Sequence, residues 1–190
     1  MTKTLITAAL IAAAFGSAQA QSATYAIDPT HTFASFEIVH FGTSTIRGRF
    51  DKKEGSVSID RAAKTGKVEI TIDMASINTG VAPFDGHLKS ADLFDVAKYP
   101  TAKFVGDKFS FNGDKVTAVA GTLTLMGKTQ PVTLKASNFN CYLNPMVKRE
   151  VCGGDFETTL QRSTFGITYA LPAAAPDSVR LLVQVEAVKQ

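Results

Sequence analysis

The sequence predicts an all-β domain, and three features of its residue pattern support this class. Apolar and polar side chains alternate along most of the chain, as in Val68–Met74, which is typical of strands with one solvated face. Glycine-containing turn signals separate these runs at short intervals, which favours antiparallel neighbours joined by tight turns. Only one segment departs from the period of two. We therefore expect about eight to ten strands, arranged as a meandering barrel or a sandwich.

The individual strands follow from the alternation and from the turns between them. The pair Asn112-Gly113, flanked by Phe109–Phe111 and Val116, predicts a hairpin because both turn residues tolerate positive φ. Gly127 and Lys128 mark a second turn. Alternating runs predict strands at residues 34–40, 68–74, 122–125, 132–136 and 179–187.

The exception to the alternation lies between residues 83 and 94. Apolar side chains recur there near helical spacing, at Phe84, Leu88 and either Leu93 or Phe94. The segment ends before Tyr99-Pro100, because the residue that precedes a proline disfavours helix. We expect one short helix or helical loop between two strands. No repeat, low-complexity tract or linker follows residue 24, so a single domain is predicted.

Composition excludes two broad classes of protein. Of the 190 residues, 45% are hydrophobic and 19% are charged, which is too apolar for intrinsic disorder. The net charge of +3 lacks the strong excess of a nucleic-acid-binding domain, although the pI of about 8.8 is slightly basic. We therefore expect a folded protein with no nucleic-acid partner.

The N-terminal residues have the layout of a secretory signal peptide. Lys3 precedes an apolar run from Leu5 to Ala14, and Ala18-Gln19-Ala20 supplies the small-x-small pattern that signal peptidase accepts. We predict a cleaved signal peptide at residues 1–20 and a mature domain at residues 21–190. Because the apolar run is shorter than the ~20 residues of a membrane span, we expect a soluble exported protein without stable membrane insertion.

The two cysteines, Cys141 and Cys152, are predicted to form one disulfide, since a single pair in an exported protein is normally oxidised. The bond would close a short loop around Asn144-Pro145-Met146 and contribute about 3 kcal/mol through chain entropy. The alternative is a redox or metal site. It lacks both the C-x-x-C spacing and a nearby histidine.

Catalytic motifs are scarce in this sequence. The three histidines, His31, His40 and His87, are not paired at metal-ligand spacing, and no P-loop, dinucleotide-binding or G-x-S-x-G motif is present. Asp85, His87 and Ser90 lie close together in the sequence, which leaves a hydrolytic arrangement open.

The residue pattern does not decide whether the interior is a filled core or a ligand cavity. On the strand at residues 34–40, His40 falls on the apolar face and Glu37 on the other. His40 is therefore either a core histidine bonded to a backbone carbonyl or a polar group that faces a ligand. The phenylalanines that could line a core or a cavity are Phe33, Phe36, Phe41, Phe84, Phe94, Phe104, Phe109, Phe111, Phe139 and Phe165.

Five segments carry a family pattern that runs in order along the mature chain. They are Tyr25–Thr32, Phe36–Gly42, His87–Pro100, Gly121–Val132 and Arg162–Gly166. Together they resemble the YceI-like family of bacterial periplasmic proteins, and His87–Pro100 is the most specific of them. The hairpin between Cys141 and Cys152 looks like the feature of a subgroup, so the resemblance implies no role for it.

The resemblance implies an extended eight-stranded antiparallel lipocalin-like barrel with one short helix inserted near residues 83–95. It also implies that a long amphiphile occupies the barrel, such as a polyisoprenoid, an isoprenoid quinone or a fatty amide. This lipid would be a ligand, and no further cofactor is expected.

Strand parity within such a barrel gives a set of candidate ligand contacts. A prenyl chain needs a continuous apolar tunnel, and its head group needs one or two donors, for which His40, His87, Asp92 and Arg162 are candidates. Arg162 could instead form a salt bridge to a neighbouring strand, and His87 and Asp92 could cap the helix or join it to the barrel. The full set of predicted contacts is Phe36, Ile38, His40, Phe84, His87, Leu88, Leu93, Phe94, Phe104, Leu123, Leu125, Arg162 and Phe165.

We therefore predict a periplasmic protein that is not an enzyme and that carries such a lipid in its lumen. One alternative is an enzyme that modifies an isoprenoid lipid, with His87 as the acid–base group. Another is a stress-related barrel that serves as a scaffold without a ligand. The sequence does not determine the oligomeric state, and a dimer is compatible with it.

Overall fold

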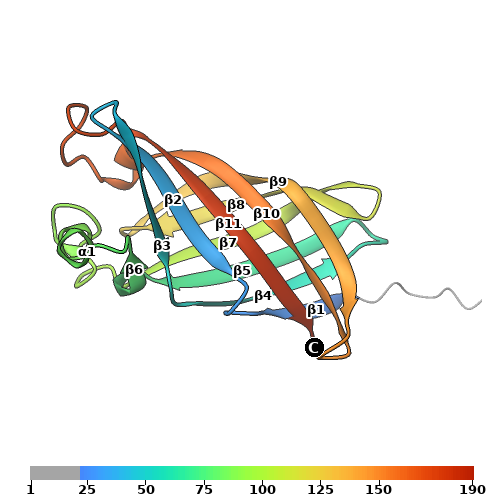
Figure 1. Cartoon of the computed structure of the whole chain (residues 1–190). Helices are drawn as coiled ribbons and strands as arrows, with labels where there is room; N and C mark the ends of the chain where they lie inside the picture. The colour runs from blue at the N-terminus through green and yellow to red at the C-terminus, as the bar shows by residue number, and fades with distance from the viewer. Residues whose placement is uncertain (1–21) are drawn as a thin grey trace, which may run out of the picture.

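In the computed structural model, which describes residues 22–190, antiparallel strands close into one barrel (Figure 1). Neighbouring strands follow the order β1-β4-β5-β7-β8-β9-β10-β11, and pairing of β1 with β11 closes the ring. The fold is thus the eight-stranded barrel that the resemblance implies. The predicted signal peptide lies outside the described residues. The barrel strands are β1 (Ala23–Ile27), β4 (Lys53–Asp60), β5 (Thr65–Asp73), β7 (Thr101–Asn112), β8 (Lys115–Leu125), β9 (Lys128–Asn144), β10 (Arg149–Gln161) and β11 (Ser178–Lys189).

Three further strands of the described chain, β2 (Phe33–His40), β3 (Ser44–Phe50) and β6 (Ile77–Asn78), continue the sheet at one end of the barrel. β2 pairs with Arg180–Gln184 of β11, whereas β1 pairs with residues 187–189 of the same strand. β1 and β2 are therefore successive parts of one ribbon. The same holds for β3 and β4, which pair with β2 and β1 respectively. This splitting explains why the segments outnumber the eight positions of the barrel.

The turn between β1 and β2 is formed by the first family segment. Asp28 Oδ1 accepts hydrogen bonds from the backbone N (2.8 Å) and the hydroxyl (2.6 Å) of Thr30, and Asp28 Oδ2 lies 2.8 Å from His31 Nδ1. Thr32 is 2% exposed, and its hydroxyl donates to the carbonyl of Glu186 and accepts from the Glu186 N–H. These bonds fix the break between the two strands because a buried hydroxyl needs polar partners.

The α-helix of the described chain, α1 (Ala82–Lys89), is shorter than the predicted helical segment of residues 83–95. It ends where Ser90 donates to the carbonyl of His87 through its backbone N (3.1 Å) and its hydroxyl (2.7 Å). Leu93 and Phe94 therefore lie in turns, with the Phe94 N–H bonded to the Leu88 carbonyl. Turns rather than helical spacing bring these apolar side chains together. Residues 22–190 also contain two 3-10 helices, η1 (Met74–Ser76) and η2 (Arg162–Phe165).

The two ends of the barrel differ in construction, and we name them by their elements. The helix end carries α1, the β2–β3 turn and the loop of residues 166–177 (Figure 1). The hairpin end carries the C-terminus and the turn between β9 and β10, where Cys141 and Cys152 form the predicted disulfide with Cα atoms 4.1 Å apart. Within residues 22–190, no helix has the length and apolar character needed to cross a bilayer.

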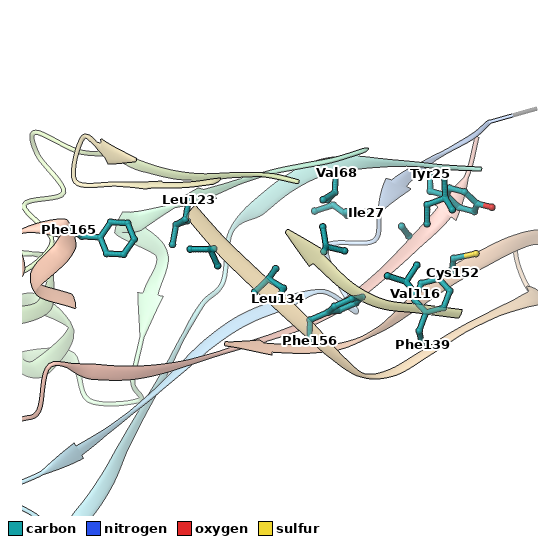
Figure 2. Packing of buried hydrophobic residues seen from close by; sticks show 14 residues of the cluster. Tyr25, Ile27, Val68, Val116, Leu123, Leu134, Phe139, Cys152, Phe156 and Phe165 are labelled. Carbon is teal, nitrogen blue, oxygen red and sulfur yellow. The ribbon is translucent and has the colours of Figure 1, made fainter. Parts of the chain in front are cut away.

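Buried apolar side chains form two clusters along the barrel. The larger cluster runs inside the closed barrel from Tyr25 and Cys152 near the hairpin end to Phe165 near the helix end (Figure 2). The smaller cluster lies under α1 and includes Phe36, Phe50 and Leu88. Because the strands alternate inward and outward residues, each contributes side chains to this interior at every second position.

Candidate functional site

Two apolar cavities lie within the barrel, one near each end. The helix-end cavity has a volume of about 150 Å³ and the hairpin-end cavity a volume of about 60 Å³. Ile72 and Ala102 line the first, while Ile70 and Phe104 line the second from the same two strands. Residues two apart on a strand share a face, so the cavities follow one another along the barrel axis.

Most of the predicted contacts lie on the helix-end cavity. Phe104 lines the hairpin-end cavity instead, and the side chains of His40, Phe84 and His87 are absent from the lining of both. The predicted residues on the helix-end cavity are Phe36, Ile38, Leu88, Leu93, Phe94, Leu123, Leu125, Arg162 and Phe165.

Sequence reasoning missed several lining residues of the helix-end cavity. The alternation in residues 68–74 and 179–187 already contained the signal for Ile72, Met74, Val179 and Leu181. Phe50 ends β3, where it alternates with Arg47 and Arg49, so the same signal was present there. Ile167 lies in a loop and had no such signal. The missed residues are Phe50, Ile72, Met74, Ala102, Leu160, Ile167, Val179 and Leu181.

A glycine and two aromatic contacts position the phenylalanines of this cavity. A Cβ atom at Gly48 of β3 would lie 2.5 Å from the Phe36 ring, so only glycine leaves room for that ring. The rings of Phe36 and Phe50 have centroids 6.2 Å apart, and those of Phe50 and Phe94 6.1 Å. At such distances tilted and edge-on rings attract one another. The cavity wall is therefore assembled from β2, β3 and the turn that follows α1.

Arg162 is the charged residue on the lining of the helix-end cavity, and it is 7% exposed. Its guanidinium donates to the carbonyls of Tyr169 (2.9 Å), Pro176 (3.0 Å) and Ala175 (3.3 Å). Burial lowers the pKa of Arg162, and Asp177 partly opposes that shift. The sequence allowed two roles for this residue, a ligand contact or a salt bridge to a neighbouring strand. Its hydrogen-bond partners in the described chain are instead three backbone carbonyls.

The guanidinium retains capacity for further bonds. It has five N–H groups, and the three carbonyls of the 166–177 loop account for one contact from each nitrogen. Asp177, the nearby acid, is engaged by the backbone N and the hydroxyl of Ser163 at 2.7 and 2.6 Å, which lower the pKa of its carboxyl. Arg162 thus presents a positive charge at an otherwise apolar wall, with no carboxylate of residues 22–190 within ion-pair distance.

The other polar candidates lie outside the cavity lining. His40 is exposed, with its ring against Phe41 at a centroid distance of 4.7 Å. His87 is half-buried, and its ring lies 5.1 Å from that of Tyr169, so it joins α1 to the 166–177 loop. Asp92 is exposed in the turn after the helix. His87 therefore makes a contact between the helix and the barrel, as one of the alternatives expected, whereas Asp92 faces solvent.

The side chains of Asp85, His87 and Ser90 are not assembled for hydrolysis. Asp85 Oδ1 accepts hydrogen bonds from the backbone N (2.7 Å) and the hydroxyl (2.6 Å) of Thr79. Ser90 donates its hydroxyl to a backbone carbonyl rather than to an imidazole nitrogen. A nucleophile and its base must share a hydrogen bond, and this set has none. Among the described residues, no group of three or more metal-ligating side chains gathers either.

A polar network lies at the hairpin end, where Tyr25 borders the smaller cavity. The Tyr25 hydroxyl donates to Glu150 Oε1 (2.6 Å), and Arg61 Nη2 donates to Glu150 Oε2 (2.7 Å). Burial and this contact with Glu150 raise the pKa of Tyr25 to about 12. The phenol therefore stays neutral and fixes β1 to β10 at this end of the barrel.

Comparison with known proteins places the chain in a family. A family profile described as "YceI-like domain" matches residues 25–187. A UPF0312 protein of Pseudomonas putida is 39% identical over 191 residues, with 99% of this chain and 98% of that protein covered.

Solved structures agree with this assignment. BcnA of Burkholderia cenocepacia superposes with a TM-score of 0.71 at 25% identity, covering 85% of this chain and 99% of BcnA. A polyisoprenoid binding domain from Saccharophagus degradans shares the fold with a TM-score of 0.61 at 18% identity, covering 87% and 98%. From the barrel, its five sequence segments and these matches, we conclude that the chain belongs to the YceI-like family.

Proposed function

We propose that this protein binds a long amphiphilic lipid inside its barrel and carries it in the periplasm. The observation that carries the proposal is the pair of successive cavities, whose lining residues are apolar apart from Arg162 and Tyr25. Burying a hydrocarbon chain stabilises a complex by about 25 cal/mol per Å² of apolar surface. An elongated apolar interior therefore suits a linear chain better than a polar metabolite.

The ligand classes that fit are a polyisoprenoid, an isoprenoid quinone and a fatty amide. Each has a long hydrocarbon tail and a small polar head that accepts hydrogen bonds. We propose that the tail lies along both cavities and that the head accepts from the free N–H groups of Arg162. The fold itself is compatible with this class, because the Saccharophagus degradans domain of the same architecture is described as polyisoprenoid binding.

A periplasmic location is supported by two features. The residues before the barrel have the layout of a cleaved signal peptide. The Cys141–Cys152 disulfide suits an oxidising compartment such as the periplasm.

The test is to express the full chain in a Gram-negative host, purify the protein from the periplasm, extract it with organic solvent and identify the extract by mass spectrometry. We expect an intact prenyl or fatty lipid near one equivalent per barrel. A barrel that yields no lipid would contradict the proposal and favour the scaffold alternative. A lipid recovered in chemically altered form only when His87 is intact would favour the enzyme.

A pair of variants on one strand sharpens this test. Leu160→Trp places an indole in the helix-end cavity, whereas Thr159→Trp places it on the exposed face of β10. We expect the first variant to lose most of the bound lipid and the second to retain it. Equal lipid content in both would mean that the helix-end cavity is not the binding site.

A further inference from the structure

The turn between β9 and β10 concentrates exposed apolar side chains far from the helix end. Leu143 is 72% exposed and Met146 88%, and Tyr142 and Val147 are exposed as well. Half of the large hydrophobic residues that the described chain exposes lie in this six-residue stretch, 142–147, which we call the tip. Such clustering marks an interaction surface, whereas single exposed apolar residues are ordinary.

The tip extends beyond the neighbouring strands. β8 pairs with β9 only as far as Lys135, so residues 136–144 of β9 have β10 as their sole partner. Likewise, β11 pairs with β10 from Val151 onward and leaves Arg149 and Glu150 outside that ladder. The hairpin therefore projects past the barrel beside the C-terminus, as Figure 1 shows.

The apolar side chains of the tip point in more than one direction. Tyr142 and Leu143 are consecutive residues of β9 and thus face opposite sides of the hairpin, yet both are exposed. A flat protein partner would cover one of these sides and leave the other in water. A surrounding apolar medium covers both. The interfacial region of a lipid bilayer is such a medium.

The tip is held in this exposed conformation. The disulfide between Cys141 and Cys152 ties the two strands together directly beneath it. Asn144 Oδ1 accepts from the backbone N of Met146 (2.9 Å) and of Val147 (3.3 Å), and the Asn144 carbonyl accepts from Lys148 N (2.8 Å). A turn that is already ordered loses little conformational entropy when it binds.

Cationic side chains surround the base of the tip. Lys148, Arg149 and Lys189 are all exposed, and no carboxylate of residues 22–190 lies within ion-pair distance of Lys148 or Arg149. The acids nearby are already engaged. Glu150 bonds Arg61 and Tyr25, and Glu186 Oε2 accepts from the Tyr142 hydroxyl at 3.4 Å. Basic residues beside an apolar protrusion attract anionic lipid head groups.

We propose that the tip, together with Lys148 and Arg149, docks the barrel onto an anionic phospholipid bilayer. Leu143, Met146 and Val147 enter the head-group boundary, Tyr142 keeps its hydroxyl at the polar level, and the two cations contact lipid phosphates. This docking stands apart from lipid carriage in the lumen, since none of these residues lines either cavity.

The test is co-sedimentation of the mature chain with vesicles of phosphatidylglycerol and phosphatidylethanolamine, with phosphatidylcholine vesicles as the neutral comparison. We expect binding to the anionic vesicles. Leu143→Ser with Met146→Ser removes the apolar anchor and should weaken binding by roughly tenfold or more. Val39→Ser with Phe41→Ser removes exposed apolar residues at the helix end and serves as the matched control, which should bind like the wild type.

The contribution of the two cations to vesicle binding is tested separately with Lys148→Gln and Arg149→Gln. Each should weaken binding to anionic vesicles by about fivefold, with little change on phosphatidylcholine. Equal melting temperatures would show that all variants are folded. The proposal is overturned if the wild type ignores anionic vesicles or if the tip variant binds as well as the wild type. It is also overturned if light scattering shows that the tip joins two copies of the chain and vesicles do not compete.

Discussion

Each end of the barrel encloses an apolar cavity, but the two ends are built by different means. At the hairpin end, paired strands, a disulfide and the Tyr25–Glu150–Arg61 network surround a cavity of about 60 Å³. At the helix end, a 3-10 helix, α1 and the 166–177 loop complete a cavity of about 150 Å³ that includes a buried cation. Strand ladders fix the first end, whereas the second depends on side-chain bonds to loop backbone.

The contrast between the two ends indicates where a ligand can enter. Regions held by few backbone ladders open at lower free energy than paired strands. The helix end is such a region, because β6 pairs only with β3 through two residues and the 166–177 loop is held by Arg162. We therefore expect exchange at the helix end and a static hairpin end, and the predictions below test that contrast.

The largest effect is expected from Arg162→Leu. The change leaves the carbonyls of Tyr169, Ala175 and Pro176 without their donor, so the free energy of unfolding should fall by about 3–5 kcal/mol. Urea denaturation measures this value. Arg47→Leu, which removes an exposed arginine at the same end, is the control and should cost at most about 1 kcal/mol. Similar losses for both would show that Arg162 does not hold the loop.

The disulfide should give the next largest effect, at the other end. The two cysteines are 11 positions apart in the sequence, and for a loop of this length chain entropy predicts about 3 kcal/mol of stabilisation. Reduction with dithiothreitol should lower the free energy of unfolding by that amount. Hydrogen exchange should then speed up in β9 and β10 while the 166–177 loop is unchanged. Faster exchange at the helix end would break the proposed independence of the two ends.

The turn at residues 28–31 connects β1 to β2 and should make the free energy of unfolding depend on pH. Hydrogen bonds from Thr30, and a smaller contribution from His31, hold the pKa of Asp28 at about 2, although burial opposes them. A lowered folded-state pKa stabilises the protein above about pH 4, and this stability is lost as the pH falls toward 2. The carboxyl is 27% exposed, so solvent screening limits the contribution to about 1 kcal/mol. Unfolding at pH 5 and pH 2.5 should show this loss in the wild type and its absence in Asp28→Asn.

The smallest effect is expected at His87, which contacts Tyr169 across the helix end. His87→Ala removes one half-buried aromatic contact and should lower the free energy of unfolding by about 0.5–1 kcal/mol. We expect faster release of bound lipid, measured by transfer to acceptor vesicles, with no change in the chemical identity of the lipid. An altered lipid composition in the variant would point to the enzyme alternative instead.

Much of the fold could be predicted from local patterns. Alternation placed the strands around Phe36, Ile70 and Leu123 because a strand repeats its inward side every second residue, whatever its partners. The Asn112-Gly113 turn and the cysteine pair were also readable from the sequence, since turn conformation and loop closure are local properties. The helix was placed correctly but made too long, because the Ser90 bonds to the His87 carbonyl end it early.

The residue pattern alone predicted the inward faces of the alternating runs at residues 68–74 and 179–187 and the short helix between strands, because both depend on the periodicity of neighbouring residues. It misplaced His40, which is exposed at the end of β2. How the interior divides into two cavities and what surrounds Arg162 are visible only in the folded chain. The partners of Arg162 are backbone carbonyls seven to fourteen residues away, and carbonyls are present at every residue. No residue type marks such partners, so only the path of the folded chain selects them.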